Sequence, residues 1–211
     1  MNRIGAEEIG RGMKIAALAV IVALGLGAGA ALAGYKEGRE AYDKQDFATA
    51  WKELEPLAKQ GNPDAMYLVA SMHHMGMGVP PSYKDAAEWY RKSADAGKID
   101  AIFTMGIVYE GGIGVPRNGP ESFAWYKKSA DRGFYAGQVK LANMYAKGQG
   151  VKKDIAQSYF WYAIAEKTAP RANNDRFEIP IIKDKLSTMM TKEQIAEMDR
   201  RAKAWKPVAA K

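Results

Sequence analysis

The sequence between Gly61 and Glu166 repeats three times with a period of 36 residues. Gly61, Gly97 and Gly133 mark the period, and the residues after each glycine align without gaps. Periods of 20–50 residues are typical of stacked-repeat proteins, because a unit this small cannot bury its own apolar face. We therefore expect a row of similar units that share a core. They are called the first (61–96), second (97–132) and third (133–168) unit.

The first half of each unit has the pattern of an amphipathic helix that ends at a glycine. In the first unit, Ala65, Val69, Met72 and His73 have the i, i+4, i+7, i+8 spacing of one helix face, and the other units keep this spacing. A glycine can end a helix in the left-handed conformation at little cost, and a second glycine and a valine complete a tight loop. The three loops contain Gly76, Gly78 and Val79; Gly112, Gly114 and Val115; and Gly148, Gly150 and Val151.

The second half of each unit begins with a helix-capping residue. The three caps differ, but each can accept a hydrogen bond from a backbone N–H at a helix start, and a polar partner follows three residues later. A Trp-Tyr pair then lies within each second helix. Helix–loop–helix is therefore predicted three times. The caps and their partners are Ser82 and Asp85, Asn118 and Glu121, and Asp154 and Gln157; the pairs are Trp89-Tyr90, Trp125-Tyr126 and Trp161-Tyr162.

The pattern A-x-x-x-[LMV]-[AG]-x-x-[YH]-x-x-G-x-G-V, followed by W-Y-x-K-S-A-D-x-G, resembles the Sel1-like repeat, a relative of the tetratricopeptide repeat. The resemblance covers Gly61 to about Glu166, half of the chain. It implies an all-α, right-handed α-solenoid that binds a protein or peptide. Some members of the family are envelope signalling regulators or chaperone-like adaptors. The chain has no cysteine, which separates it from the cysteine-rich exported branch of the family and weakens any inference drawn from that branch.

The segments on either side of the repeats have the patterns of helical caps. Residues 34–60 predict a shorter, tetratricopeptide-like hairpin with its turn at 43–46, as expected for the terminal unit of a solenoid. Residues 169–211 predict a C-terminal cap and tail, in which the loop 170–176 is rich in turn formers.

Two helices are predicted within the C-terminal cap. We place Pro180 in the first turn of a helix that carries Ile182, Leu186 and Met189. Thr191 and Gln194 form a capping box that opens a last helix. We favour a cap that closes the solenoid over a membrane-surface or partner-binding helix. The apolar stripe of the last helix consists of Ile195, Met198, Ala202 and Trp205.

Residues 1–33 have the pattern of an export signal. Three cations precede an unbroken run of apolar and small residues that ends in Ala31-Leu32-Ala33. A positive region, an apolar region and an A-x-A site are typical of a cleaved signal peptide, so we expect cleavage before Gly34. The alternative is a retained membrane anchor, because the run is near the minimum length that spans a bilayer.

Both interpretations place the repeats on the far side of the membrane, since positive charge before the run holds the N-terminus inside. We expect a periplasmic or secreted protein, or one anchored with its repeats outside the cytoplasm. The membrane is then a partner only through an uncleaved N-terminal segment. Met13 would make a more ordinary start than Met1. Without cysteine there are no disulfides, so stability has to come from the stacking of repeats.

The composition argues against nucleic-acid binding and against catalysis. The net charge is +7, and +6 remains without the three cations and two acids of residues 1–33. These charges are spread out and form no basic stripe with interleaved aromatic residues. His73 and His74 are adjacent in one helix, about 100° apart, so they cannot chelate one metal together. His73 occupies the column of Tyr109 and Tyr145, so we interpret it as a packed substitute for tyrosine. We expect no catalytic residue, metal or cofactor.

A second row of residues on each first helix lies opposite the buried stripe, with the spacing i, i+4, i+7. In solenoids of this kind the first helices line the concave surface, so the row would form a partly apolar binding groove. The alternative is that neighbouring first helices simply pack together there. The row consists of Tyr67, Ser71 and His74; Phe103, Ile107 and Glu110; and Val139, Asn143 and Ala146.

The sequence therefore predicts an exported scaffold that holds a protein or peptide in its concave face, with no nucleic acid as partner. It names neither that partner nor the oligomeric state. An envelope enzyme that acts on cell-wall material is one alternative. A structural spacer, which would lack an apolar groove, is another.

Overall fold

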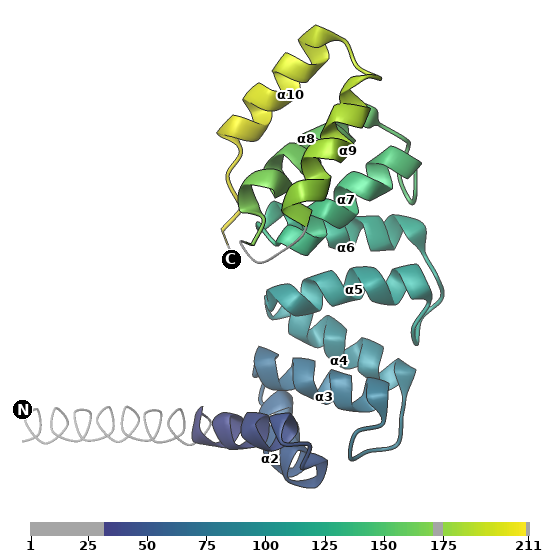
Figure 1. The fold of residues 1–211 in the computed structure, drawn as a ribbon. Coiled ribbons are helices and arrows are strands. Elements are labelled where there is room, and N and C mark those ends of the chain that lie inside the picture. Colours follow the sequence, from purple (N-terminus) through teal and green to yellow (C-terminus); the bar gives the residue numbers. More distant parts are fainter. Residues whose placement is uncertain (1–31, 171–174, 210–211) are drawn as a thin grey trace, which may run out of the picture.

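The computed structural model describes residues 32–170 and 175–209, which form helices and no strand. This confirms the predicted all-α solenoid, and Figure 1 shows its hairpins stacked in one row. The predicted signal or anchor, apart from its last two residues, lies outside the described residues. Within them, no helix is long and apolar enough to cross a bilayer. The helices are residues 32–43, α2 (Phe47–Lys59), α3 (Pro63–Met75), α4 (Tyr83–Asp95), α5 (Ile99–Gly111), α6 (Gly119–Asp131), α7 (Tyr135–Lys147), α8 (Ile155–Thr168), α9 (Asp175–Ser187) and α10 (Lys192–Ala204).

Each predicted unit is one hairpin, and each hairpin packs on the next. The units are α3–α4, α5–α6 and α7–α8, and from α2 to α8 every helix packs against the one that follows it in the chain. The core therefore runs along the stack as three successive clusters of buried side chains. α9 and α10 both pack against α8 and cover the last unit.

The loop within each hairpin is closed by the same hydrogen bonds in all three units. In the first unit the cap Gly76 is left-handed, and the N–H of Met77 donates to the carbonyl of Met72. The N–H of Ser82 then donates to the carbonyl of His73 at 2.9 Å, while the Ser82 hydroxyl accepts from the N–H of Asp85. The equivalent bonds join Asn118 to Tyr109 and Asp154 to Tyr145, also at 2.9 Å.

The second glycine of each loop touches the preceding unit. Gly114 has φ +71°, and a Cβ atom there would lie 2.0 Å from the carbonyl oxygen of Tyr83, the first residue of α4. The same contact joins Gly150 to Gly119 and Gly78 to Phe47, the first residues of α6 and α2. The loop of one unit thus rests on the start of the previous second helix, where a side chain has no space.

A small residue also lets the two helices of the second unit approach each other. A Cβ atom on Gly106 of α5 would lie 2.5 Å from ring carbons of Tyr126 on α6. The Ser122 hydroxyl donates to the carbonyl of Gly106 at 2.9 Å.

The predicted start of α9 is wrong. Pro180 is the sixth residue of α9 and not in its first turn, because the helix begins at Asp175. Ile179 is buried in the core beside α8. The free energy gained by this burial offsets the loss of the backbone hydrogen bond that Pro180 cannot donate. Met189 lies beyond the end of α9 and is exposed, whereas Leu186 is buried as predicted. The predicted loop 170–176 lies mostly outside the described residues.

The contact between units predicts unequal effects of alanine at two left-handed glycines. Gly61→Ala adds a Cβ atom where φ is +97° but no atom lies within 4 Å, so it should cost only backbone strain, about 1 kcal/mol. Gly114→Ala adds the same strain and a clash with α4, so we expect a loss of about 3 kcal/mol. Urea unfolding followed by circular dichroism measures both losses. Equal losses would contradict the role given to this contact.

Candidate partner-binding surface

The predicted partner-binding residues lie on α3, α5 and α7, and we call them the first-helix surface. Seven of the eight are half-buried, and Ile107 is exposed. The surface is thus less open than an unoccupied apolar groove would be. It consists of Tyr67, Ser71 and His74 on α3, Phe103, Ile107 and Glu110 on α5, and Val139 and Asn143 on α7.

Buried tyrosines of the second helices hold this surface in place. Each Trp-Tyr pair places its tyrosine hydroxyl against the first helix of the same unit. The Tyr90 hydroxyl lies 3.1 Å from Ser71 Oγ, and Tyr162 donates to Asn143 Oδ1 at 2.9 Å. In the second unit Ile107 occupies the position of Ser71 and cannot bond, so Tyr126 donates to Glu110 Oε2 at 2.8 Å, about one turn further along.

Burial changes the acid–base properties of these groups. Burial is the main reason that the pKa of Tyr90 rises to about 12. Burial, with the neighbouring Glu110 carboxylate, raises the pKa of Tyr126 even further. For Glu110, burial acts to raise the pKa, but hydrogen bonds from Lys140 and Tyr126 outweigh it and the pKa is lowered. These groups are therefore fixed in one protonation state at neutral pH and serve as hydrogen-bond partners.

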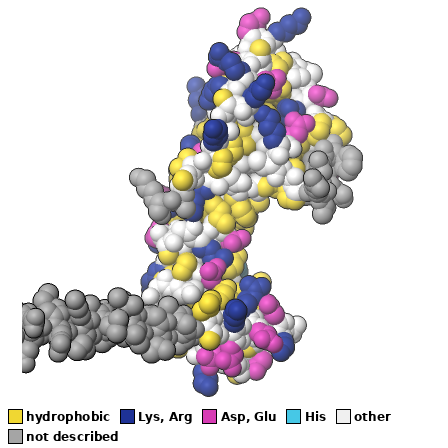
Figure 2. Space-filling model, turned by 90° about the vertical axis from the view of Figure 1, so that its left-hand side faces the viewer, with side chains coloured by type: hydrophobic (Ala, Val, Ile, Leu, Met, Phe, Trp, Pro, Cys, Tyr) yellow, Lys and Arg dark blue, Asp and Glu magenta, His cyan; other side chains and the backbone are white. Residues whose placement is uncertain are grey.

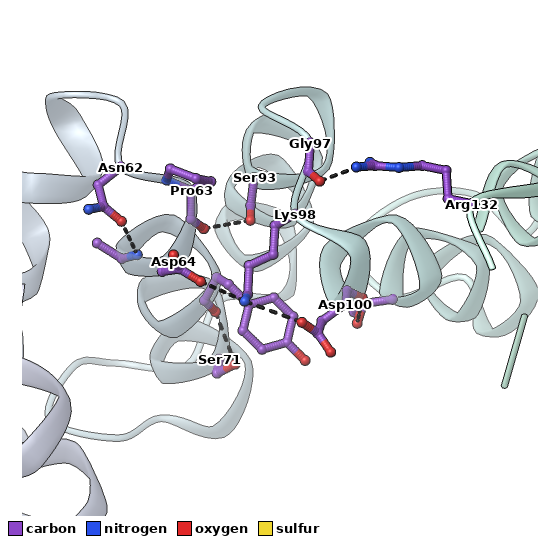
Figure 3. A network of polar contacts seen from close by, with 12 residues as sticks. Asn62, Pro63, Asp64, Ser71, Ser93, Gly97, Lys98, Asp100 and Arg132 are labelled. Atoms are coloured by element: carbon purple, nitrogen blue, oxygen red, sulfur yellow. Dashed lines mark hydrogen bonds and ion pairs between the residues drawn. The ribbon is translucent and has the colours of Figure 1, made fainter. Parts of the chain in front are cut away.

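Lysines bridge successive first helices along the same surface. Lys98 Nζ lies 2.6 Å from Asp64 on α3 and 3.2 Å from Asp100 on α5, and Figure 3 shows the lysine between the two carboxylates. Lys140 on α7 pairs with Glu110 on α5 at 2.9 Å. Burial acts to lower the pKa of Lys98, but its two aspartates outweigh burial and raise it.

Aromatic rings fill the space between these polar groups. Tyr67 lies against Tyr90, with ring centroids 5.4 Å apart. Phe103 lies between Tyr126 and Phe134, with centroids 5.3 Å from each. Phe134 belongs to the third unit and lies directly before α7, so Phe103 packs against the neighbouring unit. For Phe103, packing between units is therefore observed, as in the alternative to an open groove. Ile107, with 39% of its surface exposed, is the large apolar side chain of the row that stays open to solvent.

A depression of about 180 Å³ lies at the N-terminal end of this surface. Sequence reasoning missed most of its lining. Lys98 could have been noticed in the sequence, because it occupies the N-cap position of its first helix. In the preceding unit this position holds Asn62, whose side chain accepts a hydrogen bond from the N–H of Ala65. A lysine side chain has no acceptor and cannot make this bond. The lining consists of Tyr35, Arg39, Asp64, Tyr67, Leu68, Lys98 and Asp100.

The described residues contain no group of three His, Cys, Asp or Glu side chains that could hold a metal ion. His73 lies edge-on to Trp51, with ring centroids 5.3 Å apart, in the packed position that its column predicted. His74 lies edge-on to Tyr83 and Tyr90. The contacts of both histidines are therefore those of packed aromatic side chains.

Comparison with known proteins identifies the repeat. The Sel1 repeat family model matches residues 63–98, 99–134 and 136–167, one match for each hairpin. The chain is a Sel1-repeat protein. This class of scaffold commonly binds other proteins. No curated protein matches the sequence.

Two solved structures share the fold of this Sel1-repeat protein. A Sel1 repeat protein from Oxalobacter formigenes is 29% identical over 66% of this chain, with a TM-score of 0.60. A protein from uropathogenic Escherichia coli, described as the protective antigen c5321 with an SLR fold, is 24% identical over 77% of this chain, with a TM-score of 0.58. The matches span 56% and 37% of those two chains.

The lowered pKa of Glu110 predicts a pH-dependent contribution to stability. A carboxylate whose pKa is lowered by folding stabilises the fold above its unfolded pKa, here 4.5, and this contribution is lost as the pH falls through the folded pKa. Glu110→Gln should therefore destabilise the protein at pH 7, by about 0.5–1 kcal/mol because the side chain is partly exposed. The difference from the wild type should shrink as the pH drops below 4.5.

Urea unfolding at pH 7 and at pH 3 measures this difference. Glu88→Gln, at an exposed position of α4, is the matched control and should change little at either pH. A loss in Glu110→Gln that stays constant between the two pH values would show that the carboxylate charge is not what stabilises this contact.

Proposed function

We propose that this Sel1-repeat protein is a non-catalytic scaffold that holds an extended segment of a partner protein on its first-helix surface. The observation that carries the proposal is the exposed Ile107 at the centre of the stack, where the equivalent positions hold the polar Ser71 and Asn143. An aliphatic residue there loses the tyrosine hydrogen bond of the other units. A partner side chain that packs on Ile107 would remove this apolar surface from water, at the centre of a surface that is otherwise fixed by hydrogen bonds.

The rigidity of the surrounding groups supports this proposal. The tyrosine hydroxyls are bonded and the bridging lysines are paired, so few side chains have to be ordered when a partner binds. A preordered surface reduces the entropy cost of association. Figure 2 shows that the outline of the molecule is hollowed between its two ends.

The charges favour a protein over a nucleic acid as the partner. Binding of a phosphate backbone needs cations that are available to phosphate groups. On this surface Lys98 and Lys140 are paired with carboxylates, and Arg39 is paired with Asp43 at 2.9 Å. The uncharged groups between these pairs suit peptide side chains and backbone.

Substitution of Ile107 tests the proposal with little risk to the fold. Ile107→Glu places a charge on the surface without entering the core, whereas Phe103→Glu would disturb the contacts with Tyr126 and Phe134. Ile181→Glu, at an exposed isoleucine of α9, is the matched control.

Crosslinking in the native compartment, followed by mass spectrometry, identifies and quantifies the captured protein. We expect Ile107→Glu to reduce capture of this protein by about tenfold, the loss of roughly 1.4 kcal/mol of binding free energy. Ile181→Glu should leave capture unchanged, and both variants should keep the melting temperature of the wild type within a few degrees. Equal capture by Ile107→Glu and wild type would refute this assignment.

We also propose that the scaffold acts outside the cytoplasm. The proposal rests on the cations, apolar run and Ala-x-Ala site of residues 1–33. Expression of the chain in a Gram-negative host, followed by fractionation and intact-mass measurement, should find in the periplasm a protein that begins at Gly34. A full-length protein in the membrane would support the retained anchor instead, and a full-length protein in the cytoplasm would contradict both.

A further inference from the structure

A groove of about 610 Å³ lies between α4 and α6, away from the first-helix surface. We call it the α4–α6 groove. Its volume is in the range of sites that bind small molecules or peptide side chains, and its lining combines apolar side chains with five charged residues. The lining residues are Ala94, Asp95 and Gly97 from α4 and the turn after it, Phe123, Ala124, Lys127, Lys128, Asp131 and Arg132 from α6 and its end, and Val208 and Ala209 from the C-terminal tail.

The tail reaches this groove by folding back from α10. Trp205, the first residue after α10, lies edge-on to Trp161 of α8, with ring centroids 6.0 Å apart. Pro207 then packs close to Gly133, and the N–H of Val208 donates to the carbonyl of Asp131 at 2.8 Å. Figure 1 shows this end of the chain returning from α10 toward the middle of the stack. The end of α6 therefore binds the backbone of a non-helical segment, and the Val208 side chain lines the groove with 61% of its surface still exposed.

In the third unit, the surface equivalent to the α4–α6 groove is covered by α10. On α8, the Tyr159 hydroxyl donates to Asp199 of α10 at 3.1 Å, and the Phe160 ring lies under Arg201 of α10, 5.0 Å from its guanidinium carbon. Phe123 and Ala124 occupy the same positions on α6, 36 residues earlier, and they line the groove. The same face of a second helix is thus covered by α10 in the third unit and left partly open in the second.

The charged residues of the lining limit which partner would fit. Lys127 pairs with Asp131 at 2.6 Å, and Arg132 donates to the carbonyl of Gly97 at 2.8 Å. Lys128 lies 4.8 Å from the centre of the Trp125 ring. Among the described residues Lys128 has no carboxylate partner, and it lies on α6 beside Ala124, so a carboxylate next to an aliphatic residue would meet a positive side chain there. The lining also contains the carboxylates of Asp95 and Asp131, and with them its three cations leave one net positive charge.

We propose that the α4–α6 groove is a docking site for an extended partner segment in which an aliphatic residue is flanked by acidic residues. The aliphatic side chain packs on Phe123, Ala124 and Ala94, and a carboxylate pairs with Lys128. The tail from Pro207 to Ala209 lies along the same groove, so it competes with this partner. The inference does not depend on the proposed role of the first-helix surface.

The test uses the full chain and a fluorescein-labelled pentapeptide, EPVAE, with KPVAK as its basic counterpart, and measures fluorescence anisotropy. We expect EPVAE to bind about tenfold more tightly than KPVAK. Val208→Gly removes the aliphatic side chain of the tail and should tighten binding of EPVAE about fivefold, because a tethered competitor is weakened. Lys128→Glu should reverse the preference between the two peptides.

Two alanine-to-tryptophan variants, one inside the groove and one outside it, provide a matched comparison. Ala124→Trp should abolish binding of EPVAE, while Ala48→Trp, at an exposed alanine of α2, should leave it unchanged. Equal binding by these two variants, or no preference for the acidic peptide, would overturn the proposal. A further outcome would also overturn it: Val208→Gly forms a dimer in analytical ultracentrifugation, and this dimer does not bind EPVAE. The groove would then hold a second copy of the chain.

Discussion

The whole structure depends on a short contact between neighbouring units, in which a loop glycine lies against the first residue of the preceding second helix. At Gly114 and Gly150 a Cβ atom would come within 2.0 and 2.2 Å of a backbone oxygen, so the position requires glycine for space as well as for its left-handed backbone. The contact recurs at the same place in each unit. It therefore sets one spacing between hairpins, and a regular row follows from it.

This spacing determines what the two faces of the row can do. On one face, the tyrosines of the Trp-Tyr pairs bond to the first helices, and Lys98 and Lys140 join one first helix to the next. That face is thereby fixed, with Ile107 left exposed. On the second-helix face, α10 covers the third unit and the tail reaches only part of the second. The first-helix surface and the α4–α6 groove thus arise from the same repeat.

The hairpins could be predicted from the sequence because their signals are local. Glycine ends each first helix, and capping residues three positions ahead of a polar partner begin each second helix. The predicted row of binding residues lies on the first helices as expected, but its hydrogen bonds to Tyr90, Tyr126 and Tyr162 depend on how two helices face each other, which periodicity does not specify.

The features that escaped prediction depend on contacts between distant segments. The extra turn of α9 before Pro180 is stabilised by burial of Ile179 beside α8, and the local preference of proline indicated a later start. The α4–α6 groove is completed by Val208, which lies 77 residues from its backbone partner Asp131. Lys98 is an intermediate case. The sequence shows a lysine in an N-cap position, but it does not show that this lysine pairs with two aspartates.

The central claim is that a single hairpin cannot hold its fold and that stacking on its neighbours supplies the missing stability. Far-ultraviolet circular dichroism of a synthetic peptide with the sequence of the second unit, residues 97–132, tests this most directly. The account predicts that the peptide is largely unfolded in water at 25 °C, while the full chain is helical and unfolds cooperatively. A peptide that is fully helical by itself and melts cooperatively near the temperature of the full chain would contradict it.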